Sequence, residues 1–104
     1  MHSLLSTIGN TPMVRLKRVA QPDFAEIWLK LEGTNPTGSY KDRMVVGQLR
    51  NAVDAGQLKK AIPLECTGGS TGTALAFACA AMGMPSAIIT SDAFSQDKTD
   101  SMRA

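Results

Sequence analysis

Short apolar runs alternate along the chain with longer segments whose apolar residues recur at helical spacing. Four runs rich in apolar residues predict strands, at residues 13–16, 26–31, 62–66 and 87–90. Turn residues cluster at 9–12 and at 21–23, and residues 3–8 are compatible with one helical turn. The pattern therefore predicts four short strands separated by turns or helices.

Three helices are predicted between and after these strands. Behind Lys41, five apolar residues form a stripe at helical spacing: Val45, Val46, Leu49, Ala52 and Val53. Gly56 ends that stripe, Gly83 ends an alanine-rich helix at 73–82, and a last helix begins near residue 95. From residue 26 onward strands and helices alternate, which is typical of right-handed βαβ crossovers. We therefore predict an α/β fold, with a parallel sheet and flanking helices in three layers.

Composition and charge exclude several kinds of protein. The chain has 104 residues, is 43% hydrophobic and carries a net charge of +2 from scattered basic residues. This is typical of one globular domain and offers no basic patch for nucleic acid. No apolar run reaches the length of about 20 residues that a membrane span needs. With one histidine, His2, the chain has almost no ligands for zinc, so we expect no metal. Cys66 and Cys79 are expected to be buried thiols in a reducing, cytoplasmic compartment.

The segment 35–43 predicts a turn that opens a helix. Ser39 and Asp42 have the spacing of a capping box, in which a hydroxyl and a carboxylate accept hydrogen bonds from free N–H groups. Lys41 lies in the first turn, where the partial positive charge of the helix end disfavours an ammonium. The neutral amine that this field favours is a nucleophile toward carbonyl carbon. The alternative interpretation is a solvated lysine on a capped helix.

A second loop, Thr67–Gly72, links the strand at 62–66 to the alanine-rich helix. Free N–H groups and hydroxyls at such a position suit a carboxylate or phosphate, although the spacing matches no nucleotide motif. A tight turn without a ligand is the alternative. Because both loops follow strand carboxyl ends, we expect Lys41 and residues 67–72 to face one pocket. An amine nucleophile beside an oxyanion loop indicates carbonyl chemistry through a Schiff base.

Three motifs resemble those of the cysteine synthase and cystathionine β-synthase family. They are Ile8-Gly9-Asn10-Thr11-Pro12-Met13-Val14-Arg15-Leu16, Lys30-Leu31-Glu32 with Asn35-Pro36, and Gly38-Ser39-Tyr40-Lys41-Asp42-Arg43. The last is similar to that family's pyridoxal-phosphate lysine segment, and loop 67–72 to its substrate-carboxylate loop. The resemblance spans essentially the whole chain. It implies the fold of the fold-type II pyridoxal-phosphate enzymes, which include the tryptophan synthase β subunit.

The resemblance also implies roles for individual residues. Lys41 would bind pyridoxal 5′-phosphate as a Schiff base and, once freed, remove the α-proton of the substrate. The substrate would be bound by Thr67, Gly68, Gly69, Ser70 and Thr71, and Ser70 would also contact the cofactor. The family loop usually reads Thr-Ser-Gly-Asn-Thr-Gly, so Gly68 replaces a serine and Ser70 an asparagine that touches the cofactor's ring hydroxyl. The substrate is therefore less firmly implied than the cofactor.

By this resemblance the reaction is β-replacement on an activated serine-type amino acid, in which sulfide or a thiol adds to give cysteine or a related thioether. Two alternatives stay open. One is β-elimination, as in serine or threonine dehydratases, which would use the same residues. The other is a non-catalytic α/β module that binds a small anion at residues 67–72.

The resemblance covers only about the first third of a family member. Residues 1–35 would belong to the family's large domain, and residues 36–104 to most of its small cofactor and substrate domain. The glycine-rich phosphate cup and the residue facing the pyridine nitrogen would follow Ala104, and the last helix has no stop signal. We therefore expect a fragment with little or no turnover alone, and a homodimer in the full-length form.

Overall fold

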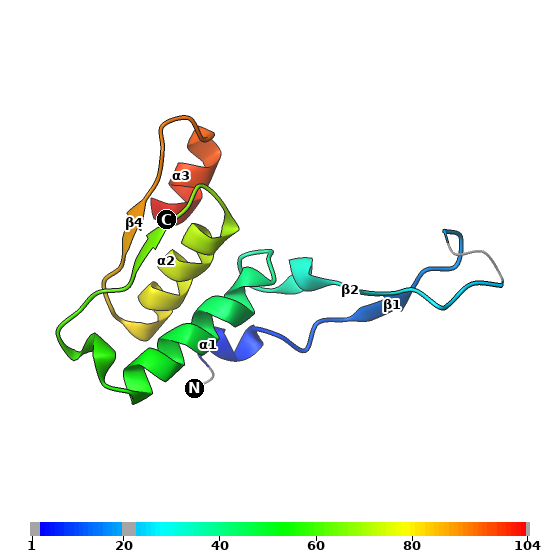
Figure 1. The fold of residues 1–104 in the computed structure, drawn as a ribbon, viewed down its shortest axis with the longest axis horizontal. Helices are drawn as coiled ribbons and strands as arrows, with labels where there is room; N and C mark the ends of the chain where they lie inside the picture. The colour runs from blue at the N-terminus through cyan, green and yellow to red at the C-terminus, as the bar shows by residue number, and fades with distance from the viewer. Residues whose placement is uncertain (1–2, 20–22, 104) are drawn as a thin grey trace.

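The computed structural model describes residues 3–19 and 23–103 (Figure 1). The strands in these ranges are β1 (Met13–Arg15), β2 (Trp28–Lys30), β3 (Leu64–Cys66) and β4 (Ala87–Ile89). The α-helices are α1 (Lys41–Asp54), α2 (Ser70–Met82) and α3 (Gln96–Arg103), and the 3-10 turns are η1 (Leu4–Thr7), η2 (Glu32–Thr34) and η3 (Gln57–Lys59). Every predicted strand and helix is confirmed, with small shifts at its ends. His2, Ala104, and Gln21 and Pro22 of the predicted turn at 21–23 lie outside the described residues.

The α/β class is confirmed, but the strand predicted at 26–31 does not join the parallel sheet. β3 and β4 pair in parallel, with Leu64 opposite Ala87. β2 pairs instead with β1, antiparallel, with Met13 opposite Lys30. A backbone hydrogen bond from Leu31 N–H to the Pro12 carbonyl at 2.9 Å extends this ribbon. The alternation of elements from residue 26 suggested one sheet, whereas β2 pairs with β1, the strand that precedes it in sequence.

The core lies between α1 and α2, which run side by side in the same direction with their first turns at the same end (Figure 1). The buried apolar side chains are Val45, Val46 and Leu49 from α1 and Ala74, Leu75, Ala78 and Cys79 from α2. Small residues on α2 let the two helix backbones approach closely. Burial of a side chain such as Leu49 stabilises the fold by about 1.5–3 kcal/mol. The start of each helix is thereby fixed beside the start of the other.

Both helices end where the sequence predicts. Gly56 follows α1 with φ +69°, and Gly83 follows α2 with φ +69°. Glycine adopts this left-handed conformation without the steric cost that a Cβ would bring. None of the helices in the described ranges is long and apolar enough to span a membrane.

The prediction of two buried thiols is only half right. Cys79 is buried in the α1–α2 core, whereas Cys66 is exposed, and both are free. Cys66 is the last residue of β3, which among the described strands pairs on one side only, with β4, so little covers it. Burial raises the pKa of the Cys79 thiol, against an opposing hydrogen bond with Ser86, and so keeps it protonated.

Candidate functional site

Lys41 is the first residue of α1, as the sequence predicts, and its side chain is half-buried. Its backbone N–H donates to Ser39 Oγ at 3.2 Å, and its Nζ lies 4.6 Å from the centroid of the Tyr40 ring. The two ion pairs found among the described residues involve other side chains. The amine of Lys41 is therefore placed against an aromatic face and has no carboxylate partner within the described part of the chain.

Asp42 is not the reciprocal partner of Ser39 that a capping box requires. Its carboxylate, 1% exposed, accepts a hydrogen bond from Thr37 N–H at 2.9 Å and a second, short one from the Thr37 hydroxyl. The loop has already turned at Gly38, whose N–H donates to the Asn35 carbonyl at 2.8 Å, and this turn brings Thr37 over the first turn of α1. Asp42 therefore ties the helix to the loop that precedes it.

Arg43 joins α1 to the segments that lie before it in sequence. Its Nε and Nη2 lie 2.7 Å and 3.0 Å from the two carboxylate oxygens of Glu32, which makes a two-point ion pair. Thr11 donates its hydroxyl to Glu32 at 2.6 Å and accepts from Arg43 Nη2 at 3.1 Å. The hydrogen bond from Arg43, and next that from Thr11, lower the pKa of Glu32 to about 2. Glu32 is therefore ionised throughout the physiological range.

Asn35 completes this network from within the loop. It is 4% exposed, and its Nδ2 donates to the Glu32 carbonyl at 2.8 Å and to Glu32 Oε2 at 3.0 Å. Its Oδ1 accepts from Gly9 N–H at 2.9 Å. Gly9 lies so close to Arg43 that a Cβ there would be 2.8 Å from Nη1. Motifs at residues 9–11, 32–35 and 41–43 are thus one hydrogen-bonded unit, which no local spacing in the sequence indicates.

Residues 67–72 run from the carboxyl end of β3 into the first turn of α2, which begins at Ser70, three residues before the predicted start; the name loop 67–72 is kept for this segment. Thr67 N–H donates to the Ile89 carbonyl of β4 at 2.9 Å, and Thr67 Oγ1 accepts from Gly69 N–H at 3.2 Å. The N–H groups of Ser70 and Thr71 have no acceptor within the described ranges. A Cβ on Gly69 would meet no atom within 4 Å. The loop therefore presents two free N–H donors beside open space, as an anion site requires.

Two side chains from the segment after β4 press on this loop. A Cβ on Gly68 would lie 2.1 Å from the Phe94 ring, and a Cβ on Gly72 would lie 2.9 Å from Sδ of Met102. Neither position has room for a Cβ while these side chains stay in place, and at Gly72 the Cβ would also lie 2.8 Å from Cγ2 of Thr67. The sequence analysis missed Phe94 and Met102, since only the folded chain places them on the loop.

The structure brings Lys41 and the loop to the same end of two packed helices, but by a different route from the one predicted (Figure 1). The prediction relied on two strands of one sheet, and β2 is not in that sheet. The α1–α2 contact does this instead: Thr71 shares a cavity of about 200 Å³ with Val45 and Leu49 of α1. Within the described part of the chain, no hydrogen bond or ion pair links Lys41 to residues 67–71.

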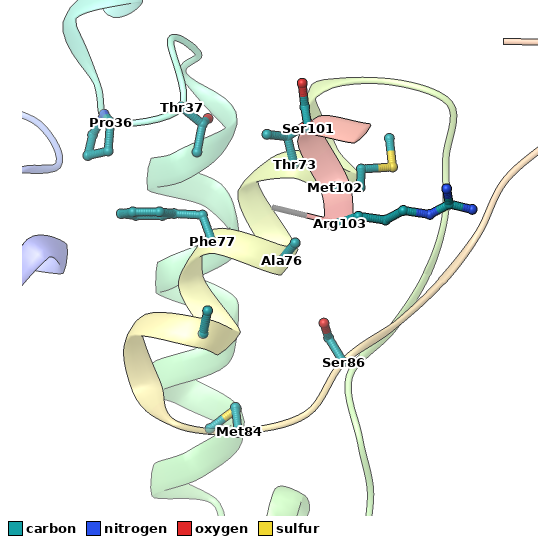
Figure 2. Close-up of a pocket in the computed structure, with 11 residues that line it drawn as sticks. Pro36, Thr37, Thr73, Ala76, Phe77, Met84, Ser86, Ser101, Met102 and Arg103 are labelled. Carbon is teal, nitrogen blue, oxygen red and sulfur yellow. The ribbon is translucent and has the colours of Figure 1, made fainter. Parts of the chain in front are cut away.

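A larger cavity of about 470 Å³ lies over the outer face of α2 (Figure 2). Pro36 and Thr37 of the loop before α1 line it together with Thr73 and Phe77 of α2. Ser86, Met102 and Arg103 close its other side. Lys41 and Ser70 do not line this cavity, which reaches the candidate site only through Pro36 and Thr37.

Comparison with known proteins identifies the family. Residues 4–104 match the family described as "Pyridoxal-phosphate dependent enzyme". The chain belongs to this family. It is 42% identical over 105 aligned positions to cysteine synthase B of Escherichia coli, across 100% of this chain and 35% of that protein. It is 39% identical to O-ureido-L-serine synthase of Streptomyces lavendulae, across 99% of this chain and 32% of that protein.

The fold is likewise that of fold-type II pyridoxal-phosphate enzymes. The crystal structure of O-acetyl serine sulfhydrylase isoform 3 from Entamoeba histolytica matches with a TM-score of 0.89 and 35% identity. That match covers 99% of this chain and 32% of the other. The chain thus spans about a third of the length of the relatives it matches. The expected resemblance to the N-terminal portion of this family is confirmed.

The residues present fit the part of a pyridoxal-phosphate site that they would have to supply. A lysine amine without a carboxylate partner can react with the cofactor's aldehyde, and the free N–H groups of Ser70 and Thr71 can receive a carboxylate. Among the described residues no group of three metal-ligating side chains occurs. The groups that these residues offer to a cofactor or substrate are thus one amine nucleophile and one loop suited to an anion.

Proposed function

We propose that this chain is part of an enzyme that carries out β-replacement on an activated serine-type amino acid with sulfide or a thiol, giving cysteine or a related thioether amino acid. Lys41 and Ser70 bind pyridoxal 5′-phosphate, and Thr67, Gly68, Gly69, Ser70 and Thr71 bind the substrate. The observation that carries the proposal is the placement of Lys41 and loop 67–72 at the same end of two packed helices, in a chain of this family.

The names of the relatives support this reaction over the alternatives. Two of them are cysteine synthase B and O-ureido-L-serine synthase, and both names describe the synthesis of a serine-type or cysteine-type amino acid. A solved relative from Helicobacter pylori, 29% identical, is described as an O-acetylserine dependent cystathionine β-synthase. We accordingly place β-elimination second, and the non-catalytic anion-binding module third.

Each residue has a task that follows from its position. Pyridoxal phosphate, when bound, supplies an electron sink that makes the α-proton of an amino acid removable. Lys41 would hold the cofactor through Nζ, and the same atom, when free, would accept the α-proton of the substrate. The free N–H groups of Ser70 and Thr71, with the Thr67 side chain at the loop entry, bind the substrate carboxylate. This contact sets the distance between the α-carbon and Lys41.

Three broader features complete the proposal: the first rests on the sequence, and the other two on the family. We propose a cytoplasmic location, a homodimer for the full-length enzyme, and a division in which residues 1–35 belong to a large domain and residues 36–104 to a small one. The Arg43–Glu32 ion pair would then join the two parts.

Trapping of the cofactor tests the part of the proposal that assigns the cofactor to Lys41, and product analysis of the full-length enzyme separates β-replacement from β-elimination. Pyridoxal phosphate is added, the adduct is reduced with borohydride, and the modified peptide is identified by mass spectrometry. We expect the label on the peptide that carries Lys41, and its loss in the Lys41→Ala variant. Lys30→Ala is the matched control, since Lys30 Nζ is already bound to the Thr11 carbonyl at 2.9 Å. Label spread evenly over the lysines would contradict the proposal.

A further inference from the structure

Lys41 is followed directly by two charged residues, and both reach away from it to hold other parts of the chain. Asp42 accepts two hydrogen bonds from Thr37, four residues before Lys41. Arg43 forms its two-point ion pair with Glu32 and donates to Thr11. Hydrogen bonds therefore hold the first turn of α1 at two places: one set joins it to the preceding loop, and the other joins it to the segments at residues 11 and 32.

We propose that Asp42 and Arg43 are positioning residues for Lys41: the two hold the first turn of α1 in a fixed frame, and so fix the place of the Lys41 amine. The proposal rests on the proposed role of Lys41 as the cofactor lysine. Neither residue touches the amine itself, since the carboxylate of Asp42 faces Thr37 and the guanidinium of Arg43 faces Glu32.

The carboxylates around the first turn of α1 explain why this frame matters for the Lys41 amine. A carboxylate free to pair with Lys41 would draw its side chain away from the Tyr40 ring. Both nearby carboxylates are instead occupied: Asp42 by the Thr37 donors, and Glu32 by Arg43, Thr11 and Asn35. Acidic groups thus lie at the start of α1 without pairing with Lys41, and the Lys41 amine lies against the ring of Tyr40.

The position of the Lys41 amine can be read without any cofactor. Reductive methylation with ¹³C-formaldehyde adds two methyl groups to each lysine amine and keeps its charge. Because Nζ of Lys41 lies 4.6 Å from the Tyr40 ring centroid, its methyl signal should be displaced by the ring current. The signal is assigned by its loss in the Lys41→Arg variant. Lys98, 5.8 Å from the Phe94 ring, gives an internal reference in the same spectrum.

Two pairs of variants separate positioning from general folding. Arg43→Lys keeps the charge but loses the two-point fork, whereas Arg15→Lys makes the same substitution in the single-contact ion pair with Glu26, on the β1–β2 ribbon. Thr37→Val removes the hydroxyl that Asp42 binds, whereas Thr37→Ser keeps it. We expect the displaced Lys41 signal to collapse toward that of an exposed lysine in Arg43→Lys and Thr37→Val. It should persist in Arg15→Lys and Thr37→Ser, with Lys98 unchanged in all four.

The trapping experiment then reports on the proposed function separately. In a protein that labels selectively at Lys41, Arg43→Lys should lower the rate of labelling there by about tenfold, the effect of one lost charge-assisted hydrogen bond. A wild-type Lys41 signal that is not displaced, or one that persists in Arg43→Lys and Thr37→Val, would overturn the positioning role. A displaced signal without selective labelling would instead leave the frame supported and reject the cofactor role of Lys41.

Discussion

The ring of Phe94 lies directly against the backbone of Gly68, so close that a Cβ on Gly68 would be 2.1 Å from two ring carbons. This contact gives a physical reason why this chain has glycine at a position where its family usually has serine. The glycine at position 68, which departs from the usual family loop, therefore accommodates the aromatic residue after β4.

Restoring the serine should be costly only while Phe94 is present. We expect Gly68→Ser to lower the free energy of unfolding by about 1 kcal/mol, at the low end of overpacking costs because the Phe94 ring is 44% exposed and can shift. In the Phe94→Ala background the same change should cost much less, which a double-mutant cycle in urea denaturation measures. Gly69→Ser is the control, since a Cβ there meets nothing within 4 Å and its φ of −144° suits any residue. Additive effects of Gly68→Ser and Phe94→Ala would show that the contact does not exist in solution.

The ion pair of Glu32 should make stability depend on acid pH. Its pKa is about 2 in the folded protein against 4.5 for an ordinary glutamate, chiefly through the hydrogen bond from Arg43. A lowered pKa contributes stability that is fully present above pH 4.5 and is lost as the pH falls from 4.5 toward 2. Thermal denaturation at a series of pH values should show this loss in the wild type and a smaller one in Glu32→Gln.

Glu26→Gln is the matched control for that experiment. It removes the ion pair with Arg15, in which both side chains are about half exposed. Exposed pairs contribute little because water screens them. Its pH dependence should follow the wild type, and an equal effect of the two variants would count against the special role of Glu32.

The α1–α2 core should respond strongly to the loss of one large side chain. Leu49 is 5% exposed, so Leu49→Ala should lower the free energy of unfolding by about 2–5 kcal/mol through lost burial and a residual cavity. Val53→Ala, on the same helix at 42% exposure, should change it by about 0.5 kcal/mol or less. Urea denaturation of both variants checks the expectation, and similar losses in the two would place the core elsewhere.

The two thiols should differ in reactivity. Cys66 is exposed, whereas Cys79 is buried and its pKa is raised by that burial. We expect a chromogenic disulfide reagent to modify one thiol quickly at neutral pH and the second only when the chain is unfolded. In the Cys66→Ser variant the fast phase should vanish; a remaining fast phase would mean that Cys79 is accessible in the folded chain.

Local sequence patterns predicted the elements and their ends well. The apolar stripe at Val45, Val46 and Leu49 gives α1, and Gly56 and Gly83 end α1 and α2 as expected. Lys41 and the loop 67–72 were placed at helix starts from turn residues and spacing alone. Such features depend on contacts within about one helical turn, which neighbouring residues decide.

The tertiary structure alone decided which strands and side chains contact one another. The pairing of β2 with β1, the bond of Asp42 to Thr37 and the exposure of Cys66 differ from the sequence-based expectations. The ion pair of Arg43 with Glu32 and the contact of Phe94 with Gly68 join residues 11 and 26 positions apart. The sequence by itself determined which segments are helices, strands and turns, and which carry the amine and the anion-binding loop. Only packing decided which of these meet, because a side chain's long-range partner depends on chain reversals and helix contacts rather than on its neighbours.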